Sequence, residues 1–198
     1  MAAYDKTEIE NKANNVLKES GLYGRRPDIV RVARFFGFET REYRDLPFVM
    51  DGFLYVLKDK RKKIIGTNED RSGEGKRFTI AQMLARYFLY HADIELEESV
   101  KYDEYAKGRN ADPKETEVDY FANCLLAPKK EFASAYNTLK ERGHDDIDII
   151  HYLQDLFRLT KESVLYRIED VKASVSRLQN ENSTERASLG SIIKNFFE

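Results

Sequence analysis

The sequence predicts an α+β protein in which helices predominate and one small antiparallel β-sheet is inserted among them. Two kinds of apolar periodicity predict this class. Most of the chain carries apolar residues at helical spacing, as at Ile9 and Ala13. Between residues 38 and 67 side chains alternate at strand spacing, as at Phe53 and Tyr55, which predicts two or three strands.

Two helices are expected before the strands. The first covers residues 5–20 and stops at Gly21, because glycine commonly follows the last turn of a helix. Pro27 is expected in the first turn of the second helix, where its missing N–H costs nothing. Gly37 is expected to end that helix.

The second half of the chain is expected to be helical apart from one long loop. Residues 92–113 are charged and show no periodicity, and so long a loop is unusual within a compact domain unless it is functional. We therefore expect this loop to be mobile. Helices are expected at residues 78–91, 114–125, 128–140, 145–157 and 160–178, and a terminal amphipathic helix at residues 189–197.

Composition and length place the chain among globular proteins. With 198 residues, of which 41% are hydrophobic and 34% charged, it can bury a core. We expect a domain of residues 1–143 and a C-terminal helical region of residues 144–198. The single cysteine, Cys124, lies in an apolar run and is expected in the core. No run approaches the ~20 apolar residues that span a bilayer, and no secretory leader is recognisable, so a cytoplasmic protein is expected.

Two segments carry a more specific pattern. The first is RFTIAQMLARYFLY (residues 77–90) and the second is ETEVDYFANCLLAP (residues 115–128). Together they resemble the ImmA/IrrE metallopeptidases, in which a motif like R-F-T-x-A-H-E-x-x-H precedes one like E-x-E-A-N-x-F-A-x-x-L-L-x-P. The resemblance extends over residues 5–175. It implies a mostly helical, zincin-like fold with a small sheet and a C-terminal helical region.

The zinc-binding part of the pattern is replaced in this chain. In the family two histidines one helical turn apart bind zinc, and the glutamate between them is the general base. The matching positions are Gln82, Met83 and Arg86, and the resemblance places Glu117 at the third ligand. Gln82 is a poor ligand, Met83 cannot accept a proton and Arg86 stays cationic. We therefore expect a degenerate cleft of Gln82, Met83, Arg86 and Glu117, with no catalytic residue, metal or cofactor.

The cleft is expected to be held by a charge pair in place of a metal. Arg86 would lie where the positive metal ion lies in the family and would neutralise Glu117, because an unpaired buried carboxylate is costly. The family resemblance also implies a partner, a helix-turn-helix transcriptional repressor from a phage or other mobile element. The expected function is therefore that of an inactive pseudopeptidase that binds such a repressor. The alternative is an active metallo-endopeptidase that cleaves the repressor through an unrecognised metal site.

Nucleic-acid binding is the third hypothesis. The net charge is −2, so binding would need a local basic patch. The basic turn Lys58–Lys63 is one candidate, although such turns are more often simply solvated. Residues 145–178 resemble a helix-turn-helix pair capped by Thr160. Their second helix mixes acidic residues such as Glu162 with basic ones, which favours packing or protein contact over DNA contact.

Overall fold

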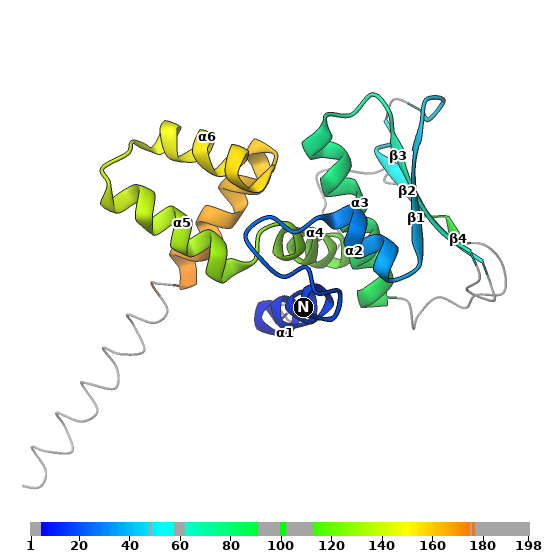
Figure 1. Cartoon of the computed structure of the whole chain (residues 1–198), viewed down its shortest axis with the longest axis horizontal. Coiled ribbons are helices and arrows are strands. Elements are labelled where there is room, and N and C mark those ends of the chain that lie inside the picture. The colour runs from blue at the N-terminus through cyan, green and yellow to red at the C-terminus, as the bar shows by residue number, and fades with distance from the viewer. Residues whose placement is uncertain are drawn as a thin grey trace, which may run out of the picture.

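The computed structural model describes residues 5–47, 49–57, 62–90, 100–101, 113–174 and 176. Figure 1 shows the sheet at one end of the molecule, helices α3 and α4 in the middle, and α5 and α6 at the other end. The α+β class expected from the sequence is confirmed. Between residues 5 and 90 and again from 113 to 174, no helix is long and apolar enough to cross a membrane.

Two short helices precede the sheet, as expected. Helix α1 (Lys6–Glu19) is capped by Asp5, whose side chain accepts hydrogen bonds from the next turn, and it buries one apolar face. Helix α2 (Ile29–Phe35) is capped by Asp28, so Pro27 lies just before the cap and the expectation that it opens the helix is wrong. Gly37 ends α2 with a φ of 83°, a conformation that favours glycine.

The sheet has four strands and is mixed. Strands β1 (Phe38–Tyr43), β2 (Gly52–Val56), β3 (Lys63–Asn68) and β4 (Val100–Lys101) lie in the order β1-β3-β2-β4. Strand β3 pairs antiparallel with β2, but parallel with β1, which corrects the expected wholly antiparallel sheet. Alternating side chains indicate that a segment is extended, whereas the order in which strands pair depends on tertiary packing.

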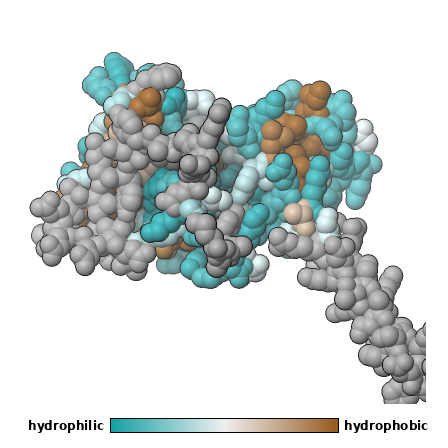
Figure 2. Space-filling view, turned by 180° about the vertical axis from the view of Figure 1, so that it is seen from behind, coloured by the Kyte–Doolittle hydropathy of each residue, from teal (hydrophilic) through white to brown (hydrophobic). Residues whose placement is uncertain are grey.

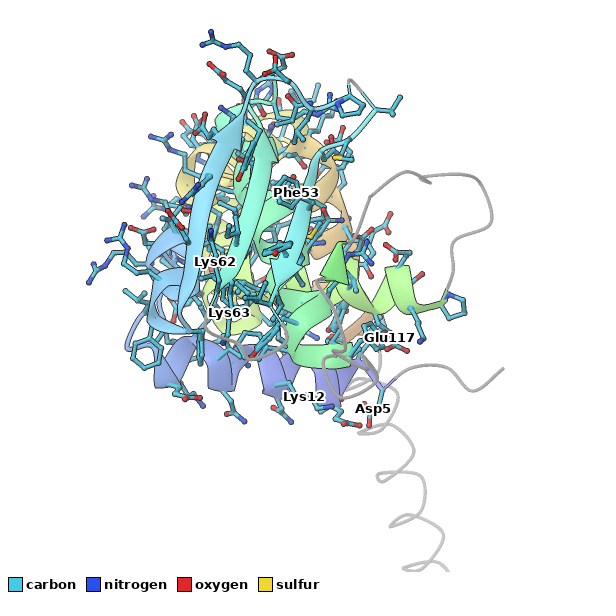
Figure 3. The ribbon with its side chains drawn as sticks, turned by 90° about the vertical axis from the view of Figure 1, so that its right-hand side faces the viewer. Asp5, Lys12, Phe53, Lys62, Lys63 and Glu117 are labelled. Carbon is cyan, nitrogen blue, oxygen red and sulfur yellow. The ribbon has the colours of Figure 1, made fainter. Side chains whose placement is uncertain are left out.

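Helices α3 (Gly73–Tyr90) and α4 (Pro113–Leu126) form the central layer. Helix α3 starts before the expected Phe78, and α4 agrees closely with its expected range. Because Gly52 has no side chain, α3 can lie close to the sheet at this point. A β-carbon at Gly52 would overlap the carbonyl of Gly66 and the side chain of Thr79. Figure 3 shows α1, which carries Lys12, crossing beneath the ends of the strands near Lys63.

The helices after α4 agree with the sequence expectation. They are α5 (Lys129–Glu141), α6 (Asp146–Phe157) and a helical stretch at residues 161–174. Thr160 caps the last of these, its Oγ1 accepting from the backbone N–H of Ser163 at 3.2 Å.

Several expectations fall outside the described residues. They concern most of the loop at 92–113, the tip of the basic turn at 58–61 and the terminal helix at 189–197. Within the loop, Val100 and Lys101 are described, and their backbone pairs with β2 as strand β4.

Candidate functional site

The candidate site lies between α3 and α4. Both helices are buried over most of their circumference, from Thr79 to Arg86 on α3 and over most of the stretch from Val118 to Leu126 on α4. Polar groups that are buried within such a pair need hydrogen-bond partners, because little water reaches them. Several polar contacts connect the two helices, and among them are three at the positions where the family carries its zinc motif.

The first two contacts follow an antiparallel register. Gln82 donates from Nε2 to Oδ1 of Asp119 at 2.6 Å. One turn along α3, the two terminal nitrogens of Arg86 donate to the two carboxylate oxygens of Glu115, each at 2.6 Å. A step of four residues forward on α3 is thus matched by a step of four residues back on α4.

The third contact joins Glu117 of α4 to Tyr90 of α3. Oε2 of Glu117 accepts from the hydroxyl of Tyr90 at 2.6 Å. Figure 3 shows Glu117 on α4, at the lower right of that view. The expected pair of Arg86 with Glu117 is therefore corrected, since Arg86 pairs with Glu115 and Glu117 is bound by Tyr90.

The remaining residue of the expected cleft is not at a surface. Met83 is fully buried, and it belongs to the continuous apolar core together with Leu84 and Phe121. Gln82 is 1% exposed and Arg86 8%. The site expected from the sequence is therefore a packed polar interface between two helices. The hydrogen-bond partners at this interface, Glu115, Asp119 and Tyr90, all lie within the two quoted segments. Which residue each of them would contact could not be predicted, because that depends on the register of α3 on α4.

The side chains at this interface do not fit a zinc ion. Zinc is held by neutral histidine, thiolate or carboxylate ligands. Here the guanidinium of Arg86 occupies a ligand position, and both oxygens of Glu115 accept its hydrogen bonds. A divalent cation at this point would be repelled by the guanidinium charge. Throughout the described ranges, no three His, Cys, Asp or Glu side chains group in a way that could hold a metal.

The histidines do not supply an alternative centre in the described structure. His144 packs edge-on against the ring of Tyr152, with 5.1 Å between the ring centroids. His151 is exposed on α6, and His91 lies outside the described residues. The structure thus brings neither described histidine to the α3–α4 interface.

The comparisons with known proteins decide the family. A model of the IrrE N-terminal-like domain, of the M78 peptidases, matches residues 25–169. The chain belongs to this family. The match includes both quoted segments and continues through α6 into the last described helix.

The solved structures show the same fold with a distant sequence. A chain described as a Mycobacterium tuberculosis transcriptional regulator is 20% identical, with a TM-score of 0.56 over 81% of this IrrE-like chain. This chain spans only 46% of that regulator's length. No curated protein matches in sequence.

A second polar cluster, which the sequence did not indicate, joins the last helix to the body of the IrrE-like domain. Arg167 is completely buried and donates to the carbonyl of Ala127 at 2.9 Å and to Asp170 at 2.9 Å. It also approaches Glu10 of α1 at 3.4 Å. Lys6 and Lys129 also belong to the cluster, because both pair with Asp170. Residues from α1, α5 and the last helix are therefore connected by one buried charge network.

The helix-turn-helix-like region presents an apolar and acidic surface. Figure 2 shows apolar side chains exposed at the end of the molecule formed by α5 and α6. Ile147 and Tyr152 of α6 are 67% and 53% exposed. The first turn of α6 also carries Asp146 and Asp148. A surface of this kind lacks the positive charge that contact with phosphates requires, so the hypothesis of DNA binding gains no support from α6.

Proposed function

We propose that this IrrE-like protein is a regulatory module that binds another protein and does not cleave peptide bonds through zinc. The partner proposed is a helix-turn-helix transcriptional repressor from a phage or mobile element, the class that the ImmA/IrrE resemblance implies. One observation carries the proposal: the guanidinium of Arg86 and the carboxylate of Glu115 form a two-pronged ion pair where the family's zinc motif lies.

Two further features of the structure support this function. The residues at the motif positions are packed rather than solvated, and Met83 and Leu84 continue the core directly through the site. An ion pair in place of the metal would still join the two helices, but it would supply neither the Lewis acid nor the general base. The domain would then keep its binding surfaces without the hydrolytic chemistry. Exposed apolar side chains on α6, such as Ile147, are of a type common at protein contacts.

The test uses the full chain and any helix-turn-helix repressors that are encoded near its own gene. Each repressor is co-expressed with the chain and co-purified, with and without added zinc, and its intact mass is measured. We expect a stable complex in which the repressor keeps its full mass in both conditions. A repressor cleaved only in the presence of zinc would contradict the absence of peptidase activity. Failure of every such repressor to bind would contradict the partner class.

A variant with the zinc motif restored provides the matched control. Gln82→His, Met83→Glu and Arg86→His together recreate the H-E-x-x-H spacing on α3. We expect zinc to bind to this variant and not to the unaltered chain, measured by calorimetric titration. Equal zinc binding by both would show that the Arg86–Glu115 pair does not exclude the metal.

A further inference from the structure

A cavity of about 370 Å³ opens beside the degenerate motif, and its lining points to a ligand. Its walls come from four parts of the chain that are distant in sequence. They are the residue before β2, the loop after β3 with the first half of α3, the middle of α4, and the start of the last helix. The side chains that matter for recognition are Asp51, Arg71, Asp119, Asn123, Glu162 and Tyr166.

The charge of the cavity favours a cation. Three carboxylates line it, from Asp51, Asp119 and Glu162, against the single guanidinium of Arg71. The Arg71 side chain forms an ion pair with Asp51. Asp119 accepts a hydrogen bond from the neutral side-chain amide of Gln82, which adds no charge to the lining. The lining therefore carries an excess of negative charge.

Asn123 gives an independent reason to expect a hydrogen-bond donor in the cavity. Its side chain lines the cavity and is buried, with the residue 4% exposed. Nδ2 donates to the carbonyl of Asp119 at 2.8 Å, while Oδ1 is buried and has no hydrogen-bond partner within the described chain. The carbonyl can only accept, so the amide cannot be turned around without losing this bond. A buried acceptor without a partner costs free energy that a donor from a ligand would recover.

The remaining walls suit the stem of an organic cation. Phe78 and Tyr166 contribute aromatic rings to the lining. An alkyl chain packs well against such rings, and a guanidinium or ammonium group gains from lying over an aromatic face. A hydrated metal ion would make no use of these rings.

We propose that this cavity binds the cationic end of a guanidinium- or ammonium-bearing alkyl chain, with Asn123 Oδ1 accepting from it and Asp119 and Glu162 balancing its charge. The source would be an arginine or lysine side chain of the protein partner, and this assignment of the source rests on the proposed function. A free small cation has the same chemistry, so the experiment separates the two sources.

The first arm of the experiment measures binding without any partner. N-acetyl-arginine amide, which carries one positive charge, is titrated into the full-length ¹⁵N-labelled chain, with N-acetyl-norleucine amide as the neutral control. We expect saturable shifts of the Asn123 side-chain amide and the Ser163 backbone signals with the arginine compound alone. Equal shifts with the neutral compound, or none with either, would overturn the proposal.

Variants then test the assigned residues. Glu162 is exposed, so Glu162→Gln is expected to fold normally and to weaken binding about fivefold, in line with an ion pair open to solvent. Glu169→Gln removes an exposed carboxylate from the same helix outside the cavity and is expected to leave binding unchanged. Asn123→Leu removes the acceptor and is expected to abolish binding. Unchanged binding by both Glu162→Gln and Asn123→Leu would overturn the proposal.

The second arm identifies the source of the cation. If a partner side chain fills the cavity, N-acetyl-arginine amide should compete with the repressor for the chain, and Glu162→Gln should weaken the repressor complex. If the amide binds but neither effect is seen, a partner side chain is excluded as the source and a free cation is supported. A failed repressor complex would overturn the proposed function while leaving the first arm intact.

Discussion

Arg86 and Glu115 form a two-pronged ion pair between α3 and α4, with both N–O distances at 2.6 Å. The Arg86 side chain is 10% exposed and that of Glu115 39%, so the pair lies at the edge of the packed interface. This relationship replaces the pair with Glu117 that the motif alone had indicated. It also gives the clearest test of the site.

A double-mutant cycle should couple Arg86 to Glu115 and not to Glu117. Arg86→Met alone leaves the Glu115 carboxylate without its guanidinium. We expect a loss of about 1–3 kcal/mol in the free energy of unfolding, less than for a fully buried pair because Glu115 is partly solvated. Adding Glu115→Gln should recover part of that loss, whereas Glu117→Gln, the matched control, should not. Urea denaturation measures the free energy of unfolding of the three single variants and of the two double variants. A coupling energy of Arg86 that is larger with Glu117 than with Glu115 would contradict the structure.

Chelators should not affect the stability of the chain. A structural or catalytic zinc ion adds its binding energy to folding, so its removal lowers the melting temperature. We expect the melting temperature to be the same within about one degree with and without EDTA, because Gln82 and Arg86 bind Asp119 and Glu115 of α4 where the family binds its metal. A decrease of several degrees would show that a metal is bound and linked to folding.

Asp170 should make the protein sensitive to acid. Burial raises the pKa of its carboxyl group, but the charges of Arg167, Lys129 and Lys6 outweigh burial and hold the pKa below its usual value. A lowered pKa stabilises the fold above the unfolded value of about 3.9, and the stabilisation is lost as the pH falls through the lower folded value. Asp170→Asn should therefore destabilise the protein at pH 7, and the difference should shrink below about pH 4. A difference independent of pH would refute the charge argument.

Arg167 should be essential for attaching the last helix. Arg167→Ala removes a completely buried guanidinium from Asp170 and Glu10, which are themselves largely buried. We expect a loss of about 3–5 kcal/mol in the free energy of unfolding. Lys161→Ala, on the exposed face of the same helix, should change the free energy of unfolding little.

Because the last helix supplies Arg167 and Asp170 to this network, a fragment of residues 1–143 should be less stable than the full chain. A fragment of equal stability would show that the two parts fold independently.

Cys124 should be unreactive in the folded protein. Its thiol is fully buried, and this burial raises its pKa to about 12. Because the thiolate is the reactive form, we expect no modification by a thiol reagent at pH 8 until the chain unfolds. The rate of modification in increasing urea then reports opening of the core. Rapid labelling without urea would place the cysteine at a surface.

The sequence alone determined the positions of several helices, one helix cap and the replacement of the zinc motif. Helical spacing located α1 and α4, and Thr160 was recognised as a cap because its chemistry is local. The sequence likewise predicted that Gln82, Met83 and Arg86 replace the zinc motif, because a guanidinium cannot be a zinc ligand in any fold.

The tertiary structure decided which partners these residues have. Glu115 and Glu117 both contact α3, one at Arg86 and the other one turn along at Tyr90. The antiparallel register of α3 on α4 therefore gives Glu115, and not Glu117, the two-pronged pair with Arg86. The parallel pairing of β1 with β3 depends in the same way on contacts between distant segments. The cavity around Asn123 required all four parts of the chain to be folded, because its lining residues share no local pattern.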